Sequence, residues 1–113
     1  MKEWIAKREL LYSLKGTDKR SELLIRISEP YLVKKGTVNF DFAEGTAGCS
    51  VEVVGLKDNE AFEEGSVHEV YGADSLQALQ IASNVEPLLK RLSKKYDIYF
   101  PDGELYFDSN DND

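Results

Sequence analysis

The stretch that decides the fold runs from Gly72 to Tyr96 and reads GADSLQALQIASNVEPLLKRLSKKY. Asp74 can accept a hydrogen bond at the start of a helix, and Gln77, three residues later, can bond back to the preceding chain, which is the capping-box arrangement. The apolar residues that follow recur at steps of three and four, so they share one helix face: Ala78, Ile81, Ala82, Val85, Leu88, Leu89, Leu92 and Tyr96. This pattern predicts one long helix from about Asp74 to Tyr96 that packs on a sheet.

Pro87 lies inside this pattern, on the side of the predicted helix that faces away from the apolar residues. A proline on the solvent side removes one backbone hydrogen bond, which water can replace while the helix bends around the core. We therefore expect a kink at Pro87 rather than the end of the helix. Basic residues fill the last turns, which suits the negative end of the helix dipole.

The sequence before the helix alternates between apolar and polar residues, which is the period of half-buried strands. The predicted strands cover residues 4–14, 23–28, 38–42, 49–53 and 67–71. Short connections between them favour antiparallel pairing. Glu29-Pro30 interrupts the second strand, because proline lacks a backbone donor and is tolerated only at an edge or a bulge. After the helix, 98–100 and 105–107 flank Pro101-Asp102-Gly103, which predicts a short strand pair.

Together these patterns predict a single α+β domain over residues 1–107. We expect an antiparallel sheet of about five or more strands, one long helix kinked at the proline on one face, and the short C-terminal strand pair. The last six residues, 108–113, are acidic and are expected to form a disordered tail. The chain opens without an apolar segment, and its single cysteine, Cys49, is expected to be buried in a strand; both features predict a cytoplasmic protein.

The net charge of −7 is unevenly distributed along the sequence. Residues 1–35 hold nine Lys or Arg and five Asp or Glu, a balance of +4, so residues 36–113 carry −11. The negative electrostatic potential that this charge produces repels nucleic acid and anionic membranes, and it speeds encounter with a basic protein surface. We therefore expect no nucleic-acid partner and no membrane partner. The alternative is that the acidity only keeps the protein soluble.

The sequence contains no recognisable constellation for catalysis. His68 is the only histidine, and its neighbours on the predicted strand point to the other face, so we expect a structural or solvent-facing imidazole. One histidine and one cysteine leave only an all-oxygen metal site, and residues 58–64 lack the order of a calcium loop. Glycine motifs that cradle phosphates are also missing. We therefore predict a protein that is not an enzyme and holds no metal or cofactor.

Residues 71–82 read YGADSLQALQIA, which resembles the G-x-D-S-x-Q-A-L-x-x-A signature of a group of small bacterial proteins of unknown function. This resemblance implies an antiparallel sheet followed by one long helix. The size and acidity of the chain are also similar to those of bacterial immunity proteins, including those of contact-dependent growth inhibition systems. That likeness implies a protein that neutralises a nuclease toxin by covering its basic active-site face.

The leading hypothesis is a protein-binding domain of the immunity or antitoxin type, with a basic toxin or nuclease domain as its partner. The alternative is a structural or regulatory interaction module; an enzyme or a small-ligand carrier with a pocket under the helix ranks below both. The predicted partner contact is an acidic segment that we interpret as a loop between two strands, together with the strand that follows it. Phe62 is the predicted exposed apolar anchor of this contact. The acidic members are Asp58, Glu60, Glu63, Glu64 and Glu69. Alternatively, this segment is only a solvated loop.

Overall fold

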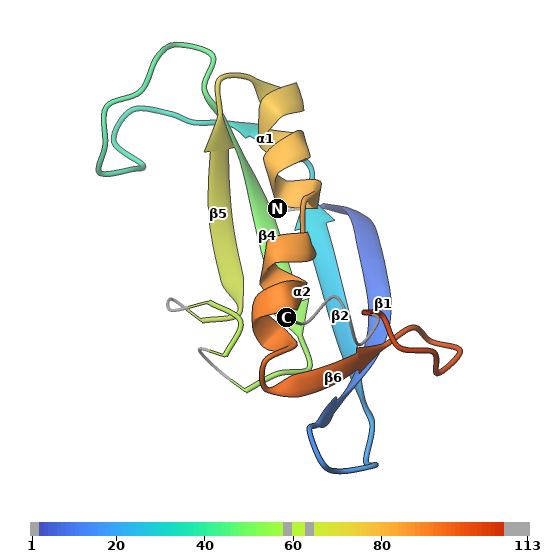
Figure 1. Ribbon diagram of the computed structural model, residues 1–113. Coiled ribbons are helices and arrows are strands. Elements are labelled where there is room, and N and C mark those ends of the chain that lie inside the picture. The colour runs from blue at the N-terminus through green and yellow to red at the C-terminus, as the bar shows by residue number, and fades with distance from the viewer. Residues whose placement is uncertain (1–2, 58–59, 63–64, 108–113) are drawn as a thin grey trace.

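The computed structural model describes residues 3–57, 60–62 and 65–107, and its helices lie on one face of an antiparallel sheet (Figure 1). The strands are β1 (Trp4–Leu14), β2 (Ser21–Ser28), β3 (Tyr31–Leu32), β4 (Ala47–Val54), β5 (Val67–Gly72) and β6 (Tyr96–Tyr99), and the helices, between β5 and β6, are α1 (Ser75–Ser83) and α2 (Glu86–Leu92). The α+β class, the antiparallel pairing and a sheet of at least five strands are confirmed.

The strand order places β4 between β5 on one side and both β2 and β3 on the other, and β2 is followed by β1 and β6. Ile27 pairs with Val51, and Tyr31 pairs with Gly48. The four residue steps from Ile27 to Tyr31 are therefore matched by only three steps along β4. The register therefore advances by one residue at Glu29-Pro30, where the interruption was predicted. In effect β3 continues β2 along the same edge of β4.

The hydrophobic core lies between the sheet and the two helices. Alternate residues of β2 and β4 face the helices and are buried: Leu23, Ile25, Ile27, Cys49, Val51 and Val53. Ala78, Ala82 and Leu89 meet them from the helical side. The buried position predicted for Cys49 is confirmed, and burial raises the pKa of its thiol, which keeps it protonated.

The start of α1 has the predicted capping bonds. Asp74 Oδ1 accepts a 2.8 Å hydrogen bond from the backbone N–H of Gln77, and Gln77 Oε1 accepts one of 2.6 Å from the backbone N–H of Ala73. A Cβ atom at Gly72 would lie 2.5 Å from the backbone nitrogen of Ala78. Glycine therefore allows the backbone of α1 to approach the end of β5 closely.

The helical segment differs from the prediction in its continuity. It bends at Asn84 and Val85, which separate α1 from α2, and Pro87 lies in the first turn of α2. Because proline has no N–H to bond to the Ser83 carbonyl, that carbonyl accepts a 3.0 Å hydrogen bond from Val85 instead. The kink expected inside one continuous helix is thus replaced by a break before the proline. Tyr96, predicted as helical, is the first residue of β6.

The strand predicted over residues 38–42 is wrong. These residues belong to the long loop between β3 and β4. The ring of Phe40 packs edge-on against Phe42, with centroids 6.1 Å apart, and against Tyr71, at 5.0 Å. The aromatic residues therefore gather around one another instead of alternating across a ladder.

Of the predicted C-terminal strand pair, only the first strand forms. β6 ends at Tyr99, and the returning chain makes only an isolated bridge between Tyr99 and Leu105. The Tyr106 N–H donates a 2.8 Å hydrogen bond to the Ile98 carbonyl, which holds this return segment beside β6. The acidic tail predicted at 108–113 lies outside the described residues.

Candidate functional site

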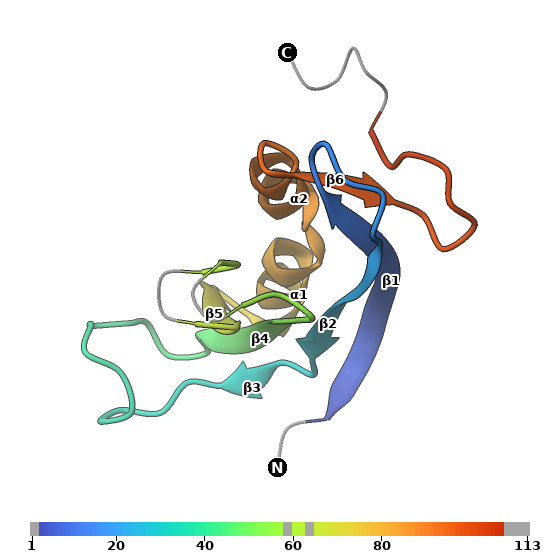
Figure 2. The ribbon, with the colours of Figure 1, turned by 90° about the horizontal axis from the view of Figure 1, so that it is seen from below.

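One face of the sheet carries both helices, and in the described part of the chain no helix covers the other (Figure 2). Side chains alternate along a strand, so the pairing register assigns each residue to one face. We call the helix-free side the open face. Its side chains include Trp4, Lys7, Glu9, Leu11, Glu22, Leu24, Arg26, Tyr31, Ser50, Glu52, Glu69 and Tyr71.

Arg26 is held at the centre of the open face by two neighbours. Its guanidinium carbon lies 4.3 Å from the ring centroid of Trp4, and its Nε donates a 2.5 Å hydrogen bond to Glu52 Oε1. All three side chains are half-buried. A stacked and paired guanidinium has little conformational freedom left to lose on binding. Trp and Arg are also among the residue types that most often dominate protein interfaces.

A second fixed group surrounds Glu69. Its Oε1 accepts hydrogen bonds from the hydroxyl groups of Tyr31, at 2.5 Å, and Ser50, at 2.7 Å. The Tyr31 ring lies over Gly48, where a Cβ atom would come within 2.5 Å of it. Burial, and then the hydrogen bond to Glu69, raise the pKa of Tyr31 far above its usual value, so its hydroxyl stays protonated.

A hollow of about 360 Å³ lies where β1 and β2 meet the turn at Pro101. On the open face its lining includes the half-buried side chains of Leu11 and Leu24 and the exposed carboxylates of Glu9 and Glu22. Lys7 Nζ lies 3.0 Å from Glu9 Oε1, but this pair is mostly exposed and therefore weak. Apolar side chains beside carboxylates suit the aliphatic stem and charged head of a lysine or arginine.

A repeated tripeptide in the sequence is a signal for this hollow. Glu9-Leu10-Leu11 and Glu22-Leu23-Leu24 are the same tripeptide, and the antiparallel register sets one against the other. In each tripeptide the central leucine is buried in the core, while the two flanking residues belong to the open face. Repetition of an acidic–apolar–apolar triplet in neighbouring strands could have indicated the site.

The residues of the predicted acidic contact do not form one surface in the described structure. Asp58, Glu63 and Glu64 lie outside the described residues. Glu60 accepts a hydrogen bond from the Tyr96 hydroxyl, and its side chain is only 17% exposed. Tyr96 lies on the helix side of the sheet, whereas Glu69 belongs to the open face. A partner contact through these residues stays a prediction.

Phe62, the predicted apolar anchor, is half-buried rather than exposed. Its ring stacks on His68, with centroids 5.1 Å apart, and it packs against the edge of the core. His68 lies on the helix side of β5, paired with Val51. The stacking gives the imidazole a packing role within the fold.

Within the ranges that the structure describes, no group of three or more His, Cys, Asp and Glu side chains gathers as a metal site would require. None of the helices in those ranges combines the length and apolar character needed to cross a bilayer.

Comparison with models of known families, with curated proteins and with solved structures finds no significant match.

Proposed function

We propose that the chain is a protein-binding domain that acts in the cytoplasm and that its open face contacts a basic protein. The partner we propose is a toxin or nuclease domain whose active-site face the chain covers, as an immunity protein would. The observation that carries the proposal is the hollow on the open face, with Glu9 and Glu22 beside Leu11 and Leu24.

The hollow suits a basic side chain better than an apolar one. A lysine or arginine can lay its methylene groups against the two leucines and bring its charge to the carboxylates. A nuclease face carries such residues because it normally binds phosphate, so a carboxylate-lined hollow can occupy the same groups and exclude the substrate. The net charge of −7 would also speed the encounter.

The fixed side chains beside the hollow would supply the rest of the contact. Arg26 is already stacked on Trp4 and paired with Glu52, and Glu69 is already held by Tyr31. Groups ordered before binding lose less entropy when the complex forms, which favours affinity as well as rate. The exposed ring of Phe40, next to Tyr71, extends this surface with apolar area.

A structural or regulatory module is the alternative, and the position of the gene separates the two. An immunity protein is expected beside the gene for the toxin that it inhibits. The experiment is therefore to measure binding of the toxin domain encoded next to this gene. We expect Glu9→Gln with Glu22→Gln to weaken binding at least about tenfold, because two charged hydrogen-bond acceptors are lost.

The matched control is Asp41→Asn with Glu44→Gln. Both residues are exposed in the loop before β4 and do not line the hollow, and the variant loses the same two charges. An equal effect of the two double variants would show that only the overall charge matters. Failure of the parent chain to bind the neighbouring toxin domain would contradict the immunity proposal.

A further inference from the structure

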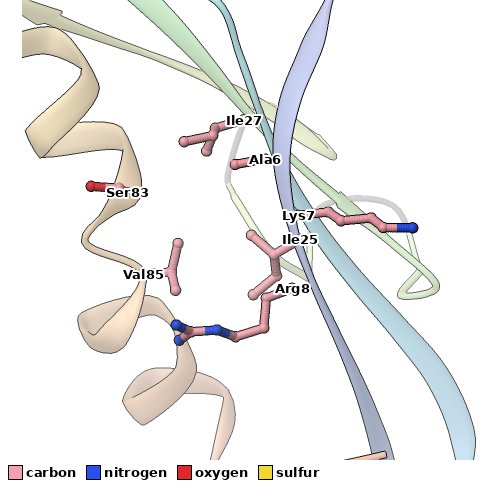
Figure 3. A pocket seen from close by; sticks show the side chains of 7 residues that line it. All are labelled: Ala6, Lys7, Arg8, Ile25, Ile27, Ser83 and Val85. Atoms are coloured by element: carbon pink, nitrogen blue, oxygen red, sulfur yellow. The ribbon is translucent and has the colours of Figure 1, made fainter.

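A second, open pocket lies on the opposite side of the sheet, where the helical segment breaks. This pocket has a volume of about 150 Å³ and lies between the break at Ser83–Val85 and the strands β1 and β2 (Figure 3). Its apolar lining consists of Ala6, Ile25, Ile27 and Val85. The pocket therefore belongs to the helix side of the sheet and is separate from the hollow on the open face.

The pocket arises because the helices leave part of β1 uncovered. Ala6 and Arg8 occupy helix-side positions of β1, opposite Ile27 and Ile25, yet both are exposed. Ile81, predicted to be buried, is exposed as well. A small residue on β1 and a bend in the helical segment thus leave apolar surface that the fold does not fill.

Arg8 supplies the charge at this pocket. Figure 3 shows its side chain reaching from β1 to lie beside Val85, whereas the neighbouring Lys7 points the other way. Arg8 Nη1 donates to the Tyr106 hydroxyl at 2.7 Å and lies 3.2 Å from Glu86 Oε1. Within the described residues, Nε and Nη2 of this guanidinium make no hydrogen bond to the protein.

The contacts of Arg8 leave it able to accept another anion. The side chains of Arg8 and Glu86 are 46% and 52% exposed, and ion pairs at that exposure are weak. The Tyr106 hydroxyl donates a hydrogen bond to Glu86 and gives that carboxylate a second partner. A guanidinium binds a carboxylate best through two parallel N–H groups, and the Nε–Nη2 edge provides such a pair.

We propose that this pocket binds a small molecule that combines a compact hydrocarbon group with a carboxylate. The hydrocarbon group would lie against Ile25, Ile27 and Val85, and the carboxylate would accept two hydrogen bonds from Arg8. An enclosed cavity of about 150 Å³ in an engineered protein holds benzene, and this more open pocket has the volume for a phenyl or branched alkyl group. The ligand class is thus the small apolar monocarboxylates.

The test is an NMR titration of the full chain with benzoate, and with benzamide as the uncharged isostere. We expect saturable shifts of the backbone amides of residues 6–8 and 85–86 with benzoate and much weaker binding of benzamide. Arg8→Gln should reduce benzoate affinity at least about tenfold, because hydrogen bonds to a charged donor are lost. Lys19→Gln is the matched control: it removes the same charge from an exposed residue between β1 and β2 that does not line the pocket, and it should leave the affinity unchanged.

A third variant tests the apolar part of the pocket. Ala6→Ile should fill the volume and abolish the shifts, and because Ala6 is exposed the protein should stay folded, which circular dichroism would verify. Absence of saturable shifts at tens of millimolar benzoate would overturn the proposal. Equal binding of benzoate and benzamide, or equal effects of Arg8→Gln and Lys19→Gln, would overturn the role of Arg8.

Discussion

Leu10 of β1 lies directly opposite Leu23 of β2, and each is the central residue of a Glu-Leu-Leu tripeptide. Because the strands are antiparallel, Glu9 faces Leu24 and Leu11 faces Glu22. The two central leucines are buried in the core, so the outer residues of both tripeptides must appear together on the open face. The pairing of β1 with β2 thus buries the two central leucines and also forms the hollow that we propose binds a basic side chain.

The core prediction concerns Leu89, which is fully buried between α2 and the sheet. Leu89→Asp places a carboxylate there without a partner and should lower the free energy of unfolding by about 3–5 kcal/mol. Leu76 in α1 is 66% exposed, so Leu76→Asp should cost less than about 1 kcal/mol. Urea denaturation measures both values, and equal costs would show that the core is assigned to the wrong helix face.

The second prediction concerns alkaline pH. The pKa of Tyr31 is raised in the folded protein by burial and by Glu69, above the value of about 10 for an unfolded tyrosine. Above pH 10 the unfolded chain therefore releases a proton that the folded chain keeps, and stability should fall as pH rises. Burial raises the pKa values of Tyr96 and Tyr106 as well, so they contribute in the same direction.

The measurement is the free energy of unfolding as a function of pH for the parent and for Tyr31→Phe. Below pH 10 we expect the variant to be about 1 kcal/mol less stable, because Glu69 loses a donor. Above pH 10 its stability should fall less steeply than that of the parent. Parallel curves throughout this range would contradict the link between the Tyr31 hydroxyl and alkaline stability.

The sequence correctly predicted the elements in which the spacing of apolar residues and the capping residue match the burial and hydrogen bonds of the folded chain. In β2 and β4 the period-2 apolar residues do face the core, and Asp74 does cap the helix. The strand predicted at 38–42 failed because these rings pack within a loop: Phe40 packs against Tyr71, and Phe42 packs against Phe40. The helical segment was predicted in the right place and it does bend, but the bend lies at Asn84 and Val85, before Pro87, which the apolar spacing alone does not reveal.

The candidate site was harder to predict than the fold. A charge count draws attention to the segment with most carboxylates, but Glu60 of that segment bonds to Tyr96 inside the fold. The hollow instead depends on the register of β1 against β2, which places Glu9 and Glu22 on one face. Register is a tertiary property, so only the repeated tripeptide could have indicated it.

The third prediction concerns Glu60, whose carboxylate accepts a hydrogen bond from Tyr96 and lies 3.6 Å from Lys95 Nζ. Glu60→Lys should lower the free energy of unfolding by roughly 1–2 kcal/mol, because it removes the acceptor for Tyr96 and places like charges together. Glu60→Gln keeps an acceptor and should cost less. Thermal melting of both variants would check this order, and the reverse order would contradict the inward position of Glu60.

The proposed contact of a basic protein with the open face can be located on the chain. The measurement is the mapping of backbone amide shifts of the isotope-labelled chain when the toxin domain encoded by the neighbouring gene is added. We expect the largest changes at residues 9–11 and 22–26 and at Tyr31, with α1 and α2 little affected. Changes concentrated on the helices or on the segment between β4 and β5, or no complex with that domain, would rule out binding of the partner at the open face.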